Sequence, residues 1–272
     1  MRIRPAIATV AGLLAAWAIL QAQNPFREWP AIEYGNFPLP SDYKAPHDWI
    51  RARLRYPDNV GYLRGMGMEL RFPGYWTMDY PRSDRHVLTG VRRLTRIDAR
   101  SAEQVVTLDG TDDIYNFPVA YGVEVGHWIL NEEQAKQLRE YLLRGGFLMV
   151  DDFHGSQEWD AFEASLKRVF PDRPWEDIPA GHPIFHTLYD VNDRMQVPGA
   201  QFLETGRTFE RDGVEPHWRG VSDDKGRIVF AICHNMDLGD AWEHSDDPDY
   251  PEKYASLAYR VGMNYFVYDL TH

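Results

Sequence analysis

The sequence predicts an α/β fold in which helices cover both faces of a mostly parallel sheet. Along residues 79–272, short apolar segments alternate with amphipathic segments of roughly 10–15 residues, which is typical of strands joined by crossover helices. No internal repeat and no low-complexity run interrupts this alternation. We therefore expect one doubly wound domain over residues 79–272, preceded by an N-terminal extension.

The first half of this alternation contains one helix and two strands. Ser83 can cap a helix that continues to Arg96, with apolar residues on one face. The segment 103–109, EQVVTLD, has the composition of a short strand, and 121–125 is expected to form a second one. Arg82 and Arg85 lie in the first turn of the helix, where cations are unfavourable. They are expected to pair with acids, with Asp112 and Asp113 as candidates, or to bind an anion.

The strongest helix signal is the segment 131–145, NEEQAKQLREYLLRG. Asn131 is a favourable N-cap, Gln134 occupies the third helical position, and Gly145 suits the C-terminal end. The apolar run 147–150, FLMV, follows at once and is typical of a strand buried on both faces.

The second half continues with a helix, a strand and a closing helix. A buried apolar stripe predicts a helix over 156–169, and the β-branched run GRIVFAICH predicts a strand over 226–234. Apolar residues at helical spacing predict the closing helix over 252–268.

Residues 23–78 differ from the rest because prolines and aromatic residues are dense there. Proline breaks helices and strands, yet a free linker would not contain so many aromatic side chains. We expect an extended arm that packs on the core, with a brief helix only at 48–55.

The N-terminus has the pattern of an export signal. The positive segment MRIR precedes a fifteen-residue apolar run, 6–20, and Ala22 suits a cleavage site. This run is shorter than the roughly 20 residues that a spanning helix prefers. Residues 1–22 therefore predict a signal peptide and a periplasmic or extracytoplasmic protein, with an uncleaved N-terminal anchor as the alternative. Contact with a membrane is expected only through this segment.

The charge balance excludes some classes of partner. The net charge is −12, and cleavage after residue 22 would remove two arginines and leave −14. Phosphate backbones and anionic lipid surfaces require a basic face, so we expect no nucleic-acid partner. Cys233 is the single cysteine, which excludes an intrachain disulfide.

Candidate ligand-pocket residues follow the expected strands, because ligands bind at the carboxyl ends of parallel strands. All of them carry carboxylate or imidazole groups. They are Glu124 and His127; Asp151, Asp152 and His154; and His234 and Asp237. Structural roles are the alternative: Asp152 can cap the next helix, and His127 can pack on the surface beside Trp128.

Asp151, Asp152, His154 and His234 are also candidate ligands for a divalent metal, since ionised carboxylate and neutral imidazole bind such ions. Their spacing matches no recognised metal signature. The sequence also lacks the glycine-rich nucleotide-binding loops and the G-x-S-x-G elbow of serine hydrolases. The cofactor therefore stays unknown, with a divalent metal as the candidate.

Several longer motifs resemble a known family. They are YPRSDRHVLTGVRRL, VEVGHW, LREYLLRGGFLMVDDFHGSQEW, FPDRP, HPIFHTLYD, CHNMDLGDAWE and YPEKY. On these motifs the chain resembles, over roughly Tyr75 to His272, an uncharacterised bacterial family, number 4159 among the domains of unknown function. The resemblance relates the chain to this family, but it implies no particular activity because none is established for the family.

A looser similarity is to the class I glutamine amidotransferase-like superfamily, and within it to the trehalose-utilisation-like proteins. It is based on the strand after RGG, the HPI segment, GRIVFAICHN and the closing RVGMNYFVY. The similarity implies a flavodoxin-like three-layer sandwich. The superfamily's amidotransferases carry their catalytic cysteine in a strand-to-helix elbow, whereas Cys233 lies on the late strand. Glutamine hydrolysis by that mechanism is therefore not expected.

Three functions stay open. The leading hypothesis is a non-catalytic exported domain that binds a small molecule or an envelope protein. The second is a hydrolase that uses the Asp/His cluster with or without a divalent metal. The third is a scaffold subunit of a membrane-associated complex, with residues 1–22 retained as an anchor.

Overall fold

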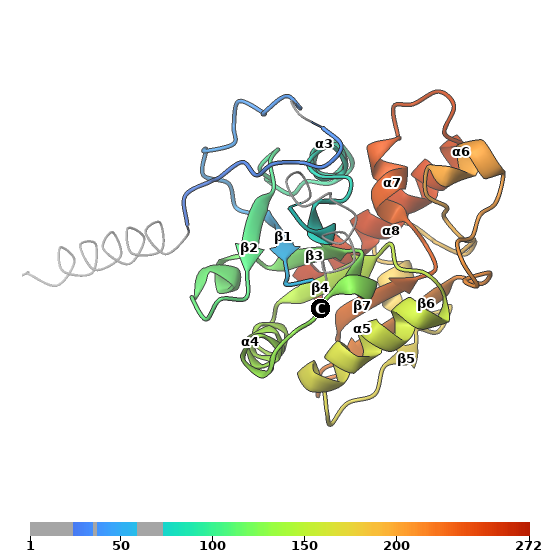
Figure 1. Cartoon of the computed structure of the whole chain (residues 1–272). Coiled ribbons are helices and arrows are strands. Elements are labelled where there is room, and N and C mark those ends of the chain that lie inside the picture. The colour runs from blue at the N-terminus through green and yellow to red at the C-terminus, as the bar shows by residue number, and fades with distance from the viewer. Residues whose placement is uncertain (1–23, 35–36, 59–72) are drawn as a thin grey trace, which may run out of the picture.

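Seven strands form one sheet at the centre of the molecule (Figure 1). The computed structural model describes residues 24–34, 37–58 and 73–272. The strands are β1 (Arg51–Arg55), β2 (Gln104–Thr107), β3 (Val119–Val123), β4 (Phe147–Asp151), β5 (Glu176–Asp177), β6 (His217–Ser222) and β7 (Ile228–His234). Their order is β2-β1-β3-β4-β7-β6-β5. The pairs from β2 to β7 are parallel, whereas β6 is antiparallel to both β7 and the edge strand β5.

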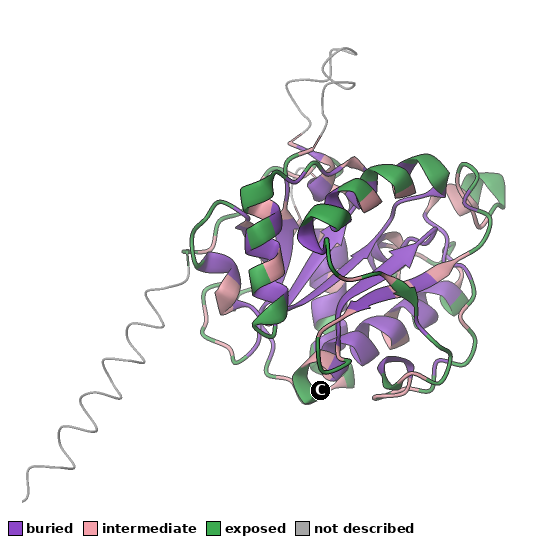
Figure 2. Ribbon diagram, turned by 90° about the horizontal axis from the view of Figure 1, so that it is seen from below, coloured by how far each residue is buried: buried purple, intermediate pink, exposed green. Residues whose placement is uncertain are grey.

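Helices lie on both faces of the sheet, and their outer sides are exposed (Figure 2). The α-helices are α3 (Arg82–Leu94), α4 (Glu132–Leu143), α5 (Gly155–Val169), α6 (Gln201–Thr205), α7 (Leu238–Glu243) and α8 (Glu252–Thr271). The 3-10 helices are η1 (Tyr75–Thr77), η2 (Asp113–Asn116), η3 (Val125–His127) and η4 (Pro183–Phe185). Buried side chains of α3, α7 and α8 pack on one face, and those of α4 and α5 pack on the other.

The predicted α/β class is confirmed, and so is the cap of α4. Asn131 accepts a hydrogen bond from the backbone N–H of Gln134, whose side chain accepts one from the N–H of Asn131. The strand expected at 121–125 begins earlier and ends at Val123, because Glu124 takes a left-handed backbone conformation.

The helix expected at 48–55 is wrong, since this stretch contains β1. Ala52 and Leu54 pack on the face of α4 and α5, whereas Arg51 and Arg53 point to the other face. Both arginines are fully buried because they share the carboxylate of Asp84 on α3, with Arg53 Nη1 at 2.7 Å from Oδ2. A strand whose alternate residues are arginines does not show the apolar pattern of a buried strand. The sheet therefore begins within residues 23–78.

The rest of the described arm contacts α3 and its neighbours. Tyr34 donates a hydrogen bond to Glu243, and Arg85 donates to the carbonyls of Phe37 and Pro38 at 2.8 and 2.9 Å. Arg82 binds Asp246 at 2.6 Å. The expected partners Asp112 and Asp113 are therefore wrong, because α3 faces the arm and α7 and not η2.

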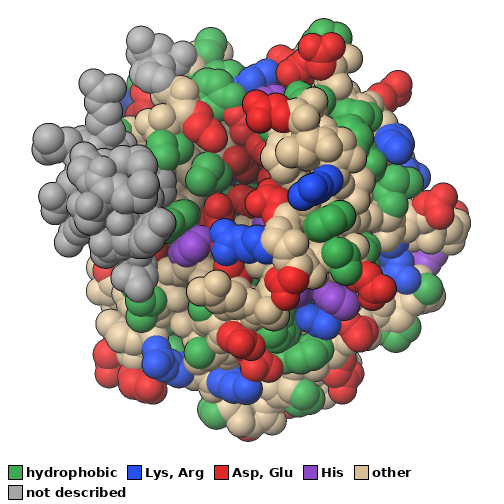
Figure 3. Space-filling model, turned by 45° about the vertical axis from the view of Figure 1, so that its right-hand side comes forward, with side chains coloured by type: hydrophobic (Ala, Val, Ile, Leu, Met, Phe, Trp, Pro, Cys, Tyr) green, Lys and Arg blue, Asp and Glu red, His purple; other side chains and the backbone are tan. Residues whose placement is uncertain are grey.

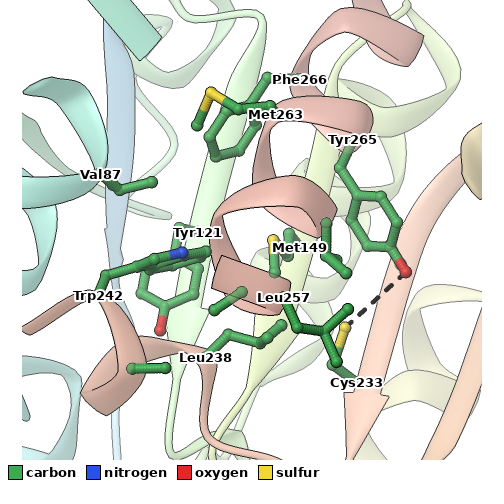
Figure 4. Packing of buried hydrophobic residues seen from close by; sticks show 14 of the residues in the cluster. Val87, Tyr121, Met149, Cys233, Leu238, Trp242, Leu257, Met263, Tyr265 and Phe266 are labelled. Atoms are coloured by element: carbon green, nitrogen blue, oxygen red, sulfur yellow. Dashed lines mark hydrogen bonds between the residues drawn. The ribbon is translucent and has the colours of Figure 1, made fainter. Parts of the chain in front are cut away.

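One face of the sheet and α8 enclose a dense apolar layer (Figure 4). Tyr121 of β3 packs against Trp242 of α7, with ring centroids 5.6 Å apart. Cys233 points from β7 towards Tyr265 of α8 and is fully buried. The expected signal peptide at 1–22 lies outside the described residues. In the part of the chain that the structure describes, no helix is both long and apolar enough to cross a membrane.

Candidate functional site

Three neighbouring parallel strands are each followed directly by a polar residue in the left-handed backbone conformation. Glu124 follows β3 with φ 51°, Asp152 follows β4 with φ 51°, and Asn235 follows β7 with φ 63°. Asp79, just after η1, has φ 59°. Such angles are uncommon for residues other than glycine, and strained backbone of this kind concentrates at functional sites.

At this edge of the sheet, the crossover connections of neighbouring strands go to opposite faces. The chain leaves β1 and returns to β2 through α3 on one face, whereas it leaves β3 and returns to β4 through α4 on the other face. The carboxyl ends of β1 and β3 therefore flank a topological switch point, where open α/β sheets bind ligands. In the space-filling view, acidic side chains gather in a hollow of the surface (Figure 3).

A group of carboxylates converges at this edge, and we call it the acidic cluster. It consists of Asp79, Asp152, Asp237, Asp240 and Glu243. One oxygen each of Asp79, Asp237 and Asp240 lies within 4.8 Å of the other two. Asp79 and Glu243 also form such a set with Glu33 of the arm.

Burial and mutual repulsion disfavour ionisation in the cluster. Burial, and then the charge of Asp240, raises the pKa of Asp79 well above its ordinary value. Burial also raises the pKa of Asp152 and Asp237 well above the ordinary value, with further repulsion from the neighbouring acids. Burial, followed by Asp240, raises the pKa of Glu243 to about 8. With few cations beside them, these carboxyl groups therefore hold their protons more tightly than exposed carboxyl groups do.

Backbone contacts fix Asp79 in place. Arg53 donates hydrogen bonds to the carbonyls of Trp76, at 2.9 Å, and of Met78. The backbone N–H of Asp79 donates to Glu33 Oε2 at 2.9 Å. Asp79 is 1% exposed, and its Oδ2 has no hydrogen-bond partner among the described residues. A buried carboxylate oxygen is thus held in the cluster without a donor.

Asp237 and Asp240 are positioned by the first turn of α7. Asp237 caps this helix, because its Oδ1 accepts a hydrogen bond from the N–H of Asp240 at 2.7 Å. Asp240 Oδ2 accepts one from the N–H of Ala200 at 2.5 Å. Pairing each carboxylate with a backbone donor leaves its other oxygen available to the cluster.

Asp151, a predicted pocket residue, has a structural role. It is fully buried at the end of β4, and its Oδ2 accepts hydrogen bonds from the N–H groups of Leu238 at 2.8 Å and Gly239 at 3.1 Å. Burial raises its pKa to about 6. Asp151 therefore holds α7, and with it Asp237 and Asp240, against the centre of the sheet.

Asp152 and His154 form a pair, with Asp152 Oδ1 at 3.2 Å from His154 Nε2. The backbone N–H of His154 donates to Glu158 at 2.6 Å, which fixes the start of α5. Burial lowers the pKa of His154 to about 4, so its imidazole is neutral at pH 7. Asp152 is thus both in the acidic cluster and next to a neutral histidine.

His234 points away from the acidic cluster. Its Nε2 lies 3.2 Å from the carbonyl oxygen of Gly155, and its ring packs on Phe153 and Trp159 with centroid distances of 4.8 Å. Burial lowers its pKa to about 3. Among residues 24–34, 37–58 and 73–272, no converging ligand set contains Asp151, Asp152, His154 or His234. The expected metal set is therefore not assembled, because the side chain of the last residue of β7 faces α5.

Glu124 and His127 belong to a second group at the same edge. His127 Nε2 lies 3.5 Å from Glu124 and 3.3 Å from Glu158, and its ring stacks on Tyr75 at 3.8 Å. Arg211 binds Glu158 at 2.5 Å. His127 and Arg211 thus pair with Glu158, whereas burial and the charge of Glu158 raise the pKa of Glu124 well above its ordinary value.

The acidic cluster combines residues that the sequence indicates, Asp240 among them, with residues that it does not. Asp240 and Glu243 lie in the acid-rich segment after the late strand, so their region carried a signal. Asp79 and Glu33 come from the segments before α3, where no strand or helix pattern marks a site. Asp152 and Asp237 are the predicted pocket residues among its members.

A separate polar groove of about 630 Å³ lies between the end of β2 and α4. Asp109, Gln137 and Glu140 are among its lining residues, and it shares none with the acidic cluster. It therefore does not belong to the switch-point site.

Comparison with known protein families gives a match. The model of a family described as "Domain of unknown function (DUF4159)" matches residues 61–270. No curated protein matches the chain.

Proposed function

Because this chain belongs to the family described as a domain of unknown function, DUF4159, we propose its function from the site itself. The protein is an exported, non-catalytic domain of the cell envelope that binds a small ligand. The ligand enters the hollow at the carboxyl ends of β1, β3, β4 and β7 and presents a positively charged group to the acidic cluster.

The observation that carries this proposal is the excess of buried carboxylate over buried cation. Arg53, whose charge acts to lower the pKa of Asp79, is already bound to Asp84. A ligand cation would supply the missing charge and would lower the raised pKa values of Asp79, Asp152 and Asp237. Burial of an uncompensated carboxylate is costly, so the site favours positive ligands over neutral or negative ones.

The fold class that we propose is the flavodoxin-like, class I glutamine amidotransferase-like sandwich. Its support is the parallel sheet with helices on both faces and the strained turn at Asp152 between β4 and α5. A carboxylate stands at this turn, and Cys233 is buried under α8. Both observations support binding and not amidotransferase chemistry.

The binding proposal is tested with pairs of ligands that differ in charge, such as glucosamine and glucose, or spermidine and a neutral polyol. We expect the melting temperature of the full chain to rise with the cationic member only, and less so at high salt. Asp152→Asn should reduce this rise, whereas Asp246→Asn, an exposed acid bound to Arg82, should leave it unchanged. Equal rises with neutral and cationic ligands would contradict the proposal.

A hydrolase is the second candidate, because Asp152 is strained, has a raised pKa and adjoins the neutral His154. In that case Asp152 would exchange a proton with the substrate or with a water molecule. The test is release of nitrophenol from a panel of nitrophenyl esters, glycosides and phosphoesters. Turnover that disappears in both Asp152→Asn and His154→Gln would favour the hydrolase over the binding domain.

Export is tested by cell fractionation with an antibody against the folded chain. We expect the protein outside the cytoplasm, and processing after residue 22 would shorten it by a measurable mass. Recovery of the unprocessed chain in the cytoplasmic fraction would contradict the proposal.

A further inference from the structure

We infer that Asp79, Asp237 and Asp240 form a binding site for one hard divalent cation, with Ca²⁺ as the preferred ion. The inference deepens the proposed function, on which it rests, because the ion would occupy the same acidic cluster and provide its positive charge. Three separate segments supply the ligands: the turn before α3, the loop after β7, and the first turn of α7.

The geometry suits an ion of this size. The three ligand oxygens lie within 4.8 Å of one another. Ca²⁺ binds oxygen at about 2.3–2.6 Å, so two oxygens on opposite sides of one ion lie about 4.6–5.2 Å apart. Three oxygens that are at most 4.8 Å apart lie at most about 2.8 Å from a common centre, so small side-chain adjustments bring all three into contact with a single ion.

The unpartnered oxygen of Asp79 points independently to a ligand. Asp79 is 1% exposed, yet its Oδ2 receives no hydrogen bond from the described residues. Leaving a buried polar atom without a partner destabilises the folded state, and the cost is greater for a charged group. A metal–oxygen bond would satisfy this atom, as the backbone N–H groups satisfy Asp237 Oδ1 and Asp240 Oδ2.

Two glycines lie directly against the three carboxylates, where a side chain would clash with their oxygens. A Cβ at Gly239 would lie 2.2 Å from Asp79 Oδ2, and one at Gly199 would lie 2.6 Å from Asp237 Oδ2 and 2.8 Å from Asp240 Oδ2. Neither glycine has a positive φ, so backbone conformation does not require glycine there. The absence of a side chain instead allows the backbone to approach the carboxylates closely.

The donor atoms decide the class of ion. The set is entirely carboxylate oxygen, which suits Ca²⁺, Mg²⁺ or Mn²⁺ and not the softer ions that favour thiolate or imidazole. Glu33 and Glu243 adjoin Asp79 and can supply further oxygen ligands. Ca²⁺ accepts six to eight oxygens in flexible geometry, whereas Mg²⁺ demands six in a strict octahedron and retains water. A cluster with this many carboxylates therefore favours Ca²⁺.

Calorimetry and thermal shift on the chelator-treated full chain test the inference, with CaCl₂, MgCl₂ and KCl as separate probes. We expect Ca²⁺ to bind with a stoichiometry of one and to raise the melting temperature, with a smaller effect of Mg²⁺ and none of KCl. Asp79→Asn and Asp240→Asn should each weaken Ca²⁺ binding about tenfold or more, because one of three charged ligands is lost. Asparagine tolerates the left-handed backbone at position 79, and far-UV circular dichroism of each variant checks its fold.

Two control variants locate the ion. Asp246→Asn removes an exposed acid near α7, and Glu158→Gln removes an acid of the second group with Glu124 and His127. Neither should change the Ca²⁺ affinity. Absence of Ca²⁺ binding in the wild type, or loss of binding in Glu158→Gln with retention in Asp79→Asn and Asp240→Asn, would overturn the inference.

The same samples separate this inference from the proposed function. If spermidine or glucosamine binds and Ca²⁺ does not, the metal site is wrong and the cationic-ligand pocket stands. If none of these probes binds, both are wrong.

Discussion

Asp151 at the end of β4 is hydrogen-bonded through Oδ2 to the backbone N–H of Leu238, at 2.8 Å, in the first turn of α7. The same oxygen accepts the N–H of Gly239 at 3.1 Å. This contact joins the central strand to the helix that contains Asp240 and is capped by Asp237. Asp151, one of the candidate pocket residues of the sequence, therefore positions the helix that contributes to the acidic cluster.

Asp151→Ala should destabilise the protein by about 2–4 kcal/mol, because it leaves two buried backbone N–H groups without their charged acceptor. Asp151→Asn retains an acceptor oxygen and should cost less. Urea unfolding monitored by circular dichroism measures both. A cost of Asp151→Ala below about 0.5 kcal/mol, the usual range of surface changes, would contradict the supporting role.

Glu243 should make the ion-free protein less stable at alkaline pH. Burial raises its pKa to about 8, above the ordinary 4.5, so the folded state binds this proton more tightly than the unfolded chain. Its stabilising contribution is complete below about pH 4.5 and is lost as the pH rises through 8. Between pH 6 and 9, in chelator, the melting temperature of the wild type should therefore fall more steeply than that of Glu243→Gln.

The control for this pH series is Glu140→Gln, which removes an exposed carboxylate of α4. Its melting curve should follow that of the wild type at every pH. If Glu243→Gln also follows the wild type, the carboxyl group of Glu243 is ionised in the folded protein without cost, and the prediction fails.

His154 and His234 should stay neutral well below pH 6. Burial lowers the pKa of His154 to about 4 and that of His234 to about 3, from the ordinary 6.5. Their contribution to stability is present above pH 6.5 and is lost as the pH falls towards these values. Histidine side-chain NMR at pH 5.5 should show both rings neutral. His186 should be protonated in the same spectrum, because hydrogen bonds to the carbonyl of Ala180 and to Asp190 raise its pKa. Protonation of His234 at pH 5.5 would mean that its ring is not enclosed by Phe153 and Trp159.

Cys233 should be unreactive in the folded protein. It is fully buried beneath α8, and burial raises the pKa of its thiol well above the ordinary value. A chromogenic disulfide reagent should label less than about a tenth of the chains within an hour under native conditions and one thiol per chain in denaturant. Rapid labelling of the native protein would show that the thiol is accessible and would reopen a nucleophilic role.

The local elements could be predicted because their signals are local. The capping box at Asn131 and the apolar run 147–150 depend on neighbours within a few residues, and the structure retains both. β1 escaped prediction because the burial of Arg51 and Arg53 depends on Asp84, which lies 33 and 31 residues further along the chain. The pairing of distant charges has no periodic signature.

The sequence by itself determined the α/β class, the buried central strands and the edge of the sheet where acids gather. These features could be predicted because hydrophobic periodicity and strand ends depend on residues that are neighbours in the sequence. The tertiary structure decided which acids share a site. In the folded protein, the side chain of Asp151 contacts α7 and that of His234 contacts α5. Asp79 lies next to Asp237 and Asp240. Those placements follow from the direction in which each side chain leaves its strand or turn and from the order of the strands, and both are settled only when the sheet and its helices pack together.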